Sequence, residues 1–198
     1  MPTSIGHALA GAAAAWSVDL VPGRRAWRTA PPTASWYRRA GNGLTLVCAA
    51  LAAVPDADLL FRLHRTFSHS IGAVVLVGIL AAAIGVLTNR PAVRLASMCA
   101  TAYGTHLLLD WLAVDLWPPY GIQAFWPFSD AWYISPWIVF RQIERARLLS
   151  AATLRLNALA VAQEIAVLAP ILIVIWLVRV KALARLAAQM SRGDHSAE

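Results

Sequence analysis

The sequence contains little charge, and this scarcity excludes most classes of soluble protein. Only 14% of its 198 residues are Asp, Glu, Lys or Arg, whereas 59% are hydrophobic and the mean hydropathy is +0.59. A typical soluble domain has about 25% charged and about 45–50% apolar residues, so this chain has too little charge to cover a water-facing surface. Disorder is also excluded, because disordered chains lack large apolar side chains. The composition predicts a small membrane protein.

Cysteine is equally scarce. The chain has two, Cys48 and Cys99, with no CxxC pair and no disulfide framework. Both lie in apolar runs, so we expect them to pack as small hydrophobic side chains. The basic n-region of a secretory signal is also lacking before the first apolar run. We therefore expect that run to be retained as a span.

Apolar runs predict an all-α, polytopic helical membrane protein with about five spans. A bilayer core requires about 20 consecutive apolar residues. Three runs approach this length, and two shorter ones leave four spans as the alternative. The runs are Ser68 to Thr88, Leu95 to Val114, Leu156 to Val178, Ile5 to Val18, and Gly43 to Val54. We expect residues 1–185 to form a single membrane-embedded domain and residues 186–198 a polar tail.

Basic residues between these runs predict the orientation. Eleven Lys and Arg side chains fall in loops on one side and six in loops on the other. The positive-inside rule places the larger group in the cytoplasm and the N-terminus outside. The net charge of +7 thus serves orientation and contact with anionic lipid. Nucleic-acid binding is not expected, because the arginines are divided among separate loops.

Residues 111–140 are rich in tryptophan and proline. Five of the nine tryptophans lie here, and prolines at 118, 119, 127 and 136 prevent a continuous helix. We expect an interfacial aromatic loop at the level of the lipid headgroups, with contact to a lipid-like substrate as the alternative. After it, residues 138–149 alternate apolar side chains with arginine, which predicts a helix lying on the membrane surface.

Histidine and aspartate gather at the ends of the expected spans, where ionisable groups are costly and indicate function. In the five-span topology they all fall at the outer, periplasmic face. Imidazole and carboxylate groups together form a ligand set for zinc, manganese or iron. The residues are His7, Asp56, Asp58, His64, His69, His106 and Asp110.

Local spacing supports a common metal site. His106 and Asp110 are four residues apart on an expected helix, so both can face one ion. His64 and His69 lie about 140° apart on an ideal helix, so a turn must separate them, with Ser68 as a candidate N-cap. In the Pro-Asp-Ala-Asp segment, one carboxylate can bind the ion while the other orients a histidine.

Each residue also has a structural interpretation. His7 fits an interfacial position, and Asp58 can pair with a nearby arginine. The His-x-x-x-Asp pair can form a hydrogen bond between helices, or part of a polar pathway for transport. Glu164 and Asn157 could reach the same cavity, although packing or a hydrogen bond across helices is the favoured role for them.

The motifs around these residues extend over most of the chain up to about residue 140. They are Thr-Ser-Ile-Gly-His ending at His7, Pro55-Asp56-Ala57-Asp58, His64-Arg65-Thr66-Phe67-Ser68-His69-Ser70, His106-Leu107-Leu108-Leu109-Asp110, and Tyr120-Gly121 followed by Trp126-Pro127-Phe128-Ser129. This pattern resembles the bacterial membrane-bound metal-dependent hydrolase family, whose members are described as inner-membrane, LexA-binding or SOS-induced hydrolases. That family is distantly similar to zinc-dependent phospholipase C and a fungal zinc nuclease.

The resemblance implies a ligand set. Those zinc enzymes are all-helical, and their metal cluster uses a His-x-x-x-Asp pair, so His106 and Asp110 would be ligands here. Their second such pair has no counterpart, because no histidine lies between His106 and His195. We therefore expect one or two ions rather than three. Further candidate ligands are His7, Asp56, His64 and His69.

Together these observations predict a metal-dependent hydrolase at the membrane–water boundary, with one hydrolase-like domain over residues 1–185. Metal-activated water would attack a lipid or lipid-linked phosphoester. Asp58 is expected to act as general base or to orient a ligand, and Arg65, or Arg62, to hold a phosphate or carboxylate. The alternative is a metal-binding transporter or sensor without hydrolysis. A purely structural or regulatory membrane protein, the third hypothesis, would bind no metal.

Overall fold

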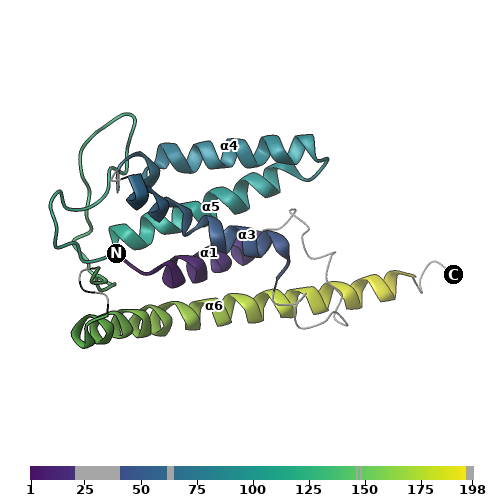
Figure 1. Cartoon of the computed structure of the whole chain (residues 1–198). Coiled ribbons are helices and arrows are strands. Elements are labelled where there is room, and N and C mark those ends of the chain that lie inside the picture. Colours follow the sequence, from purple (N-terminus) through teal and green to yellow (C-terminus); the bar gives the residue numbers. More distant parts are fainter. Residues whose placement is uncertain (21–40, 62–64, 146, 148, 195–198) are drawn as a thin grey trace.

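The computed structural model describes residues 1–20, 41–61, 65–145, 147 and 149–194 (Figure 1). Within these residues every regular element is a helix, as expected. The α-helices are α1 (Ser4–Asp19), α3 (Gly43–Leu51), α4 (Ile71–Leu87), α5 (Ala92–Trp111) and α6 (Ala151–Asp194), and the 3-10 helices are η2 (Val54–Phe61) and η3 (Phe67–His69). The segment between α5 and α6 is irregular.

Helix α5 forms the centre of the bundle. It packs against α1, α3 and α4, and α1 also contacts α6. Small residues line these contacts: Ala15 of α1, Cys48 of α3 and Ala102 of α5 belong to one buried cluster. A Cβ atom at Gly11 would lie 2.6 Å from the carbonyl oxygen of Cys48, so α1 and α3 can approach this closely only because residue 11 is glycine. Cys99 is buried in the same cluster, so both cysteines pack as expected.

Helix α6 holds α1 at both ends. Asp19, the last residue of α1, accepts a hydrogen bond from Arg94 of α5 (Nη2 to Oδ1, 3.0 Å) and lies 3.6 Å from Nε of Arg179 in α6. We call these three residues the Asp19 ion cluster. At the other end, Glu164 of α6 accepts hydrogen bonds from the hydroxyl and the backbone N–H (2.7 Å) of Thr3, the N-cap of α1. Glu164 therefore makes the hydrogen bond across helices that the sequence favoured.

Side-chain caps set where the helices begin. Asn42 forms a capping box at the start of α3, and Ser70 Oγ accepts a hydrogen bond from the N–H of Ala73 (3.1 Å) at the start of α4. The expectation that Ser68 caps this helix was wrong. The Ser68 hydroxyl donates instead to the carboxylate of Asp58, which places it in the candidate site.

The prediction of about five membrane spans was wrong, as was the alternative of four. Among the described residues, one helical stretch is long and apolar enough to cross a membrane, Ala151–Ala182 of α6. A span needs about 20 apolar residues, whereas α1 has 16 residues, α3 has 9 and α4 has 17. Helix α5 has 20 residues but carries Arg94 and Asp110.

The orientation depended on the same count of spans. Because only one helical stretch of the described chain is long and apolar enough to cross a membrane, the loops cannot be assigned to two sides of a membrane in the way the five-span topology required. The placement of the site on the periplasmic side therefore loses its basis.

Residues 138–149 do not form the expected surface helix in the part of them that the structure describes. The N–H of Phe140 donates to the carbonyl of Leu112 (3.3 Å), and the carbonyl of Phe140 accepts from the N–H of Val114 (2.9 Å). Further along, the side-chain amide of Asn157 binds both the N–H (2.8 Å) and the carbonyl (2.9 Å) of Glu144. These backbone groups are thus already hydrogen-bonded to other elements, so a helix is not needed to satisfy them.

The aromatic segment that precedes these residues is irregular, as expected. Trp117, Phe128 and Trp137 are exposed on it. Figure 1 shows the segment looping out at the end of the bundle where the N-terminus lies. Helix α6 continues to Asp194, so it includes part of the expected polar tail.

Candidate metal centre

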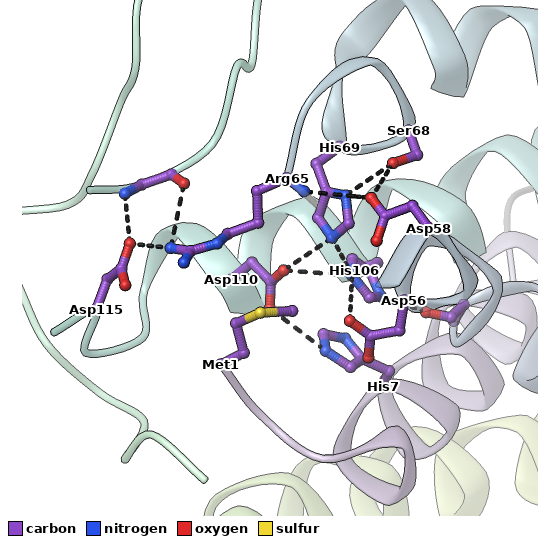
Figure 2. Close-up of polar contacts among 12 residues, drawn as sticks. Met1, His7, Asp56, Asp58, Arg65, Ser68, His69, His106, Asp110 and Asp115 are labelled. Atoms are coloured by element: carbon purple, nitrogen blue, oxygen red, sulfur yellow. Dashed lines mark hydrogen bonds and ion pairs between the residues drawn. The ribbon is translucent and has the colours of Figure 1, made fainter. Parts of the chain in front are cut away.

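A polar cluster forms where four separate segments meet at one end of the bundle (Figure 2). Helix α1 contributes one histidine from its first turn, η2 contributes two aspartates, η3 contributes one histidine, and the last two turns of α5 contribute a histidine and an aspartate. All are buried apart from Asp56, which is half-buried. We call His7, Asp56, Asp58, His69, His106 and Asp110 the histidine–aspartate cluster.

Four side chains of the cluster direct their ligand atoms at a common centre. His69 Nε2 lies 3.0 Å from His106 Nε2 and 3.2 Å from Asp110 Oδ2, and His106 Nε2 lies 3.3 Å from that same oxygen. Asp56 Oδ1 is 3.9 Å from His106 Nε2, and the four ligand atoms all lie within 4.8 Å of one another. In a tetrahedral site with bonds of about 2.0–2.1 Å, the ligand atoms are about 3.3–3.4 Å apart. The spacing among His69, His106 and Asp110 fits one such ion, and Asp56 Oδ1 lies further out.

Outer hydrogen bonds turn both imidazoles toward this centre. His106 Nδ1 donates to the backbone carbonyl of Ala52, the C-cap of α3, at 2.7 Å. His69 Nδ1 lies 3.1 Å from Oδ2 of Asp58, which also accepts a hydrogen bond from the Ser68 hydroxyl. With Nδ1 protonated, each ring presents the lone pair of Nε2 to the centre, as ligating histidines do in protein metal sites.

The charge of Asp110 is balanced by imidazoles rather than by Lys or Arg. Burial raises the pKa of Asp110, but the three neighbouring histidine rings, that of His106 above all, outweigh burial and hold this pKa well below its ordinary value. Burial lowers the pKa of His69, while the adjacent carboxylates of Asp110 and Asp58 raise it to about 9. Burial also lowers the pKa of His106. Asp110 is therefore ionised in a buried site, where it attracts positive charge.

Several buried atoms of the cluster have no hydrogen-bond partner among the residues that the structure describes. They are both carboxylate oxygens of Asp110, Oδ1 of Asp56 and both ring nitrogens of His7. Buried polar atoms are nearly always hydrogen-bonded, because an unsatisfied one costs free energy. Such atoms gathered at one place indicate that a ligand binds there, and their chemistry, imidazole nitrogen and carboxylate oxygen, fits a divalent cation.

His7 lies on the other side of the Asp110 carboxylate. Its ring stacks on that of His106, with the centroids 3.7 Å apart, and its Nε2 lies 3.4 Å from Asp110 Oδ1. Asp110 thus faces His69 and His106 through Oδ2 and His7 through Oδ1. His7 is outside the group of four ligand atoms but contacts the same carboxylate.

The structure brings together the predicted metal ligands that it describes. Asp56, His69, His106 and Asp110 share one centre, and His7 adjoins it. The remaining predicted ligand, His64, lies outside the described residues, as does Arg62. Because these side chains lie together, a common site explains their positions better than a separate structural role for each one.

The two predicted catalytic residues lie around this centre. Asp58 is behind His69, where it holds Nδ1. Arg65 lies at the edge of the cluster, with its backbone N–H donating to Asp58 (3.2 Å) and its side chain in an ion pair with Asp115 (Figure 2). Burial lowers the pKa of Arg65, whereas the nearby carboxylates of Asp110 and Asp58 raise it. The positive charge of Arg65 is thus balanced within the protein.

Sequence reasoning missed three supports of the site. The Ala52 carbonyl that holds His106 is a backbone group, and no residue type marks it in a sequence. The Ser68 hydroxyl lies inside a motif that was recognised, but its position suggested a helix cap. Asp115 follows Asp110 by five residues and is one of only ten acidic residues, so its rarity is a signal that could have been used.

Comparison with known proteins indicates where in the cell the protein is located. Residues 1–188 match the family described as YdjM inner membrane protein, so the match includes the histidine–aspartate cluster and most of α6. The chain belongs to this family. No curated protein and no solved structure matches it. This YdjM-family protein is therefore an inner-membrane protein with a possible metal site, and the family description names no activity.

Proposed function

We propose that this YdjM-family protein is a metal-dependent hydrolase that acts at the membrane on a lipid or lipid-linked phosphoester. The observation that carries the proposal is the group of ligand atoms on His69, His106 and Asp110, which are spaced as around one tetrahedral ion. Asp56 Oδ1 is further out, 3.9 Å from His106 Nε2, so a fourth position of the ion can be taken by water. A cluster that served only packing would not leave buried carboxylate oxygens without hydrogen-bond partners. Both imidazoles are also oriented by outer hydrogen bonds, which a metal site requires.

We propose zinc as the ion, with manganese and iron as the alternatives. Two imidazole nitrogens and one carboxylate oxygen, with a fourth position left open to water, are a ligand set of catalytic zinc sites, whereas sites richer in carboxylate suit manganese. The group of four accounts for one ion. A second ion would use the other side of the Asp110 carboxylate, where His7 Nε2 lies 3.4 Å from Oδ1.

We assign a separate role to each residue around the centre. A divalent ion at this centre supplies Lewis acidity, which lowers the pKa of water and polarises a phosphoryl oxygen. Asp58 holds the proton on Nδ1 of His69 and so keeps Nε2 available as a ligand. His7 Nε2 lies 3.4 Å from Oδ1 of Asp110, on the side of that carboxylate away from the centre, so we assign to His7 the positioning of Asp110.

Metal analysis of the purified protein tests this proposal. The variants are Asp110→Asn, which removes a shared ligand, and Asp130→Asn, an exposed aspartate that serves as matched control. We expect stoichiometric metal in the wild type and in Asp130→Asn, and none in Asp110→Asn. Metal-loaded protein should then hydrolyse a phosphoester from a panel of phospholipids and soluble esters.

The outcomes separate the competing functions. Absence of stoichiometric metal in wild-type protein purified without chelator would refute the metal centre and with it the hydrolase. Bound metal without turnover of any ester in the panel would favour a metal-binding transporter or sensor. Two ions per chain would make His7 a ligand of the second ion rather than a residue that only positions Asp110.

A further inference from the structure

A pocket of about 260 Å³ includes Arg65, at the edge of the histidine–aspartate cluster, and we call it the head pocket. Its lining combines Arg65 and Arg145 with the acidic Asp115 and Glu144 and with Met1, Trp117, Gln142 and Ile143. Arg65 connects it to the cluster, because its backbone N–H binds Asp58 and the carboxylate of Asp110 is close enough to act on its charge. Arg65 thus contacts both the head pocket and the histidine–aspartate cluster.

A second pocket, of about 270 Å³, continues from the first, and we call it the tail pocket. The two share Trp117, Gln142, Ile143 and Glu144 in their linings, so they form one groove. The residues that line the tail pocket alone are the apolar Val114, Leu116 and Leu156, and Arg141. Leu156 belongs to the first turns of α6, within the one stretch of the described chain that could cross a membrane. The groove thus extends from Arg65 and Arg145 to Leu156 of α6.

The two arginines of the head pocket differ in their partners. Arg65 is paired with Asp115 and also lies 3.5 Å from the carbonyl of Gly121. Arg145 is exposed, and the structure records no carboxylate partner for it among the described residues. The contact recorded for its guanidinium is with Met1 Sδ, at 3.5 Å. A guanidinium that no carboxylate of the described residues pairs is suited to hold phosphate, which it binds through two parallel hydrogen bonds.

We propose that the head pocket and the tail pocket together bind one phospholipid molecule, with its phosphate at Arg145 and an acyl chain along Trp117, Ile143 and Leu156. The groove has the charge and the apolar lining that the two ends of such a molecule require. Its apolar end lies at α6, so the lipid can enter from the bilayer. This inference rests on the proposed function only in placing the scissile phosphoester beside the metal centre, and it names Arg145, rather than Arg65, as the residue that holds the phosphate.

Lipid binding to the chelator-treated protein tests the groove without turnover. The probes are dihexanoylphosphatidylglycerol, the uncharged dihexanoylglycerol and glycerol phosphate, titrated calorimetrically into protein in a non-ionic detergent. The wild type should bind dihexanoylphosphatidylglycerol at least 10-fold more tightly than either fragment, because each fragment lacks one half of the contacts. Equal affinity for glycerol phosphate would overturn the proposal in favour of a site for free phosphate esters.

Two pairs of variants localise the two ends of the lipid. Arg145→Gln should weaken binding of dihexanoylphosphatidylglycerol about 10-fold and leave that of dihexanoylglycerol unchanged, because the guanidinium contacts only the phosphate. Its control is Arg147→Gln, an exposed arginine two residues along that lines neither pocket. Leu156→Gln should weaken the phospholipid about 10-fold and leave glycerol phosphate unchanged. Its control is Leu154→Gln, which is equally exposed on α6 but outside the tail pocket.

The proposal fails if Arg145→Gln binds the phospholipid as Arg147→Gln does, or if Leu156→Gln binds it as Leu154→Gln does. Thermal unfolding of each variant checks that its fold is intact. Failure of the groove and failure of the hydrolase are distinguishable. A protein that binds phospholipid in this way but turns over no ester loses the proposed function and keeps the groove. A protein in which Arg145→Gln hydrolyses phospholipid at the wild-type rate keeps the function and loses the groove.

Discussion

Helix α1 carries buried charge at both ends, and the two ends are built differently. At its C-terminal end, Asp19 accepts hydrogen bonds from Arg94 and lies 3.6 Å from Arg179, so an acid is neutralised by arginines of the chain itself. At its N-terminal end, His7 faces Asp110, which has three imidazoles around it. There the carboxylate oxygens have no hydrogen-bond partner among the residues described.

This difference separates a structural ion cluster from a candidate functional one. A buried ion pair that is complete within the chain is weak evidence of function, because it can serve packing alone. The histidine–aspartate cluster contains buried oxygen and nitrogen atoms without hydrogen-bond partners in the described chain, and a bound cation would give these atoms a partner. In a protein with ten acidic residues, the contrast identifies which buried acids are available for chemistry.

The largest effect is expected from a substitution in the histidine–aspartate cluster, at the N-terminal end of α1. Asp110→Asn should remove stoichiometric metal, because Asp110 Oδ2 lies 3.2–3.3 Å from both ligating imidazoles. The loss of affinity should exceed the roughly 100-fold that removal of an outer partner causes. Elemental analysis after gel filtration measures it, with Asp19→Asn as control. If Asp19→Asn loses as much metal, the two ends do not differ as stated.

The next largest effect is expected from a substitution in the Asp19 ion cluster, at the C-terminal end of α1. Asp19→Asn should lower the free energy of unfolding by about 3 kcal/mol, because it leaves the buried guanidinium of Arg179 without the Asp19 carboxylate. Denaturant titration in detergent measures this change. Metal content should remain at the wild-type value. Unfolding at unchanged denaturant concentration would contradict the structural role assigned to the Asp19 ion cluster.

A smaller effect sharpens the roles within the histidine–aspartate cluster. Asp58→Asn should weaken metal binding by roughly 10–100-fold without abolishing it, because Asp58 orients His69 and is not one of the four ligand side chains. Competition with a chromogenic chelator gives the affinity, and Asp130→Asn is again the control. A loss as complete as that of Asp110→Asn would make Asp58 a ligand.

The smallest expected effect is a coupling close to zero. His7 and Asp19 are about 18 Å apart along α1, so changes at the two ends should be additive within about 0.5 kcal/mol. At a free metal concentration of about 100 Kd, bound metal should stabilise the fold by about 2.7 kcal/mol. Removing the metal with a chelator should therefore lower the free energy of unfolding by this amount in the wild type and equally in Asp19→Asn. A double cycle of denaturant titrations measures the coupling, and a coupling above about 1 kcal/mol would show that the ends are not independent.

The helices were largely predictable, whereas their relation to the membrane was not. Each expected apolar run contains a helix, because apolar content and helix breakers act locally: Pro91 precedes α5 and Ser70 caps α4. The number of spans failed because span length depends on where caps and turns end each helix. Only the stretch Ala151–Ala182 reaches the required length and apolarity in the described chain.

Part of the site was predicted correctly, but one of the reasons for that prediction, the five-span topology, was wrong. The five-span topology placed His7, Asp56, His69 and Asp110 at one membrane face, and the structure does bring them together. The cause is the antiparallel packing of α1 on α5, which sets the first turn of one helix beside the last turn of the other. That packing is independent of whether either helix crosses a membrane.

The sequence by itself determined the membrane class, the positions of the helices and the pairing of His106 with Asp110, which are four residues apart on one helix face. These properties depend on composition and on contacts within a few residues. Only the tertiary structure decided that Ala52 orients His106, that Asp58 orients His69, and that Asp19 meets Arg94 from 75 residues away. Such contacts depend on how whole helices pack, and packing joins residues whose spacing in the chain carries no periodic signal.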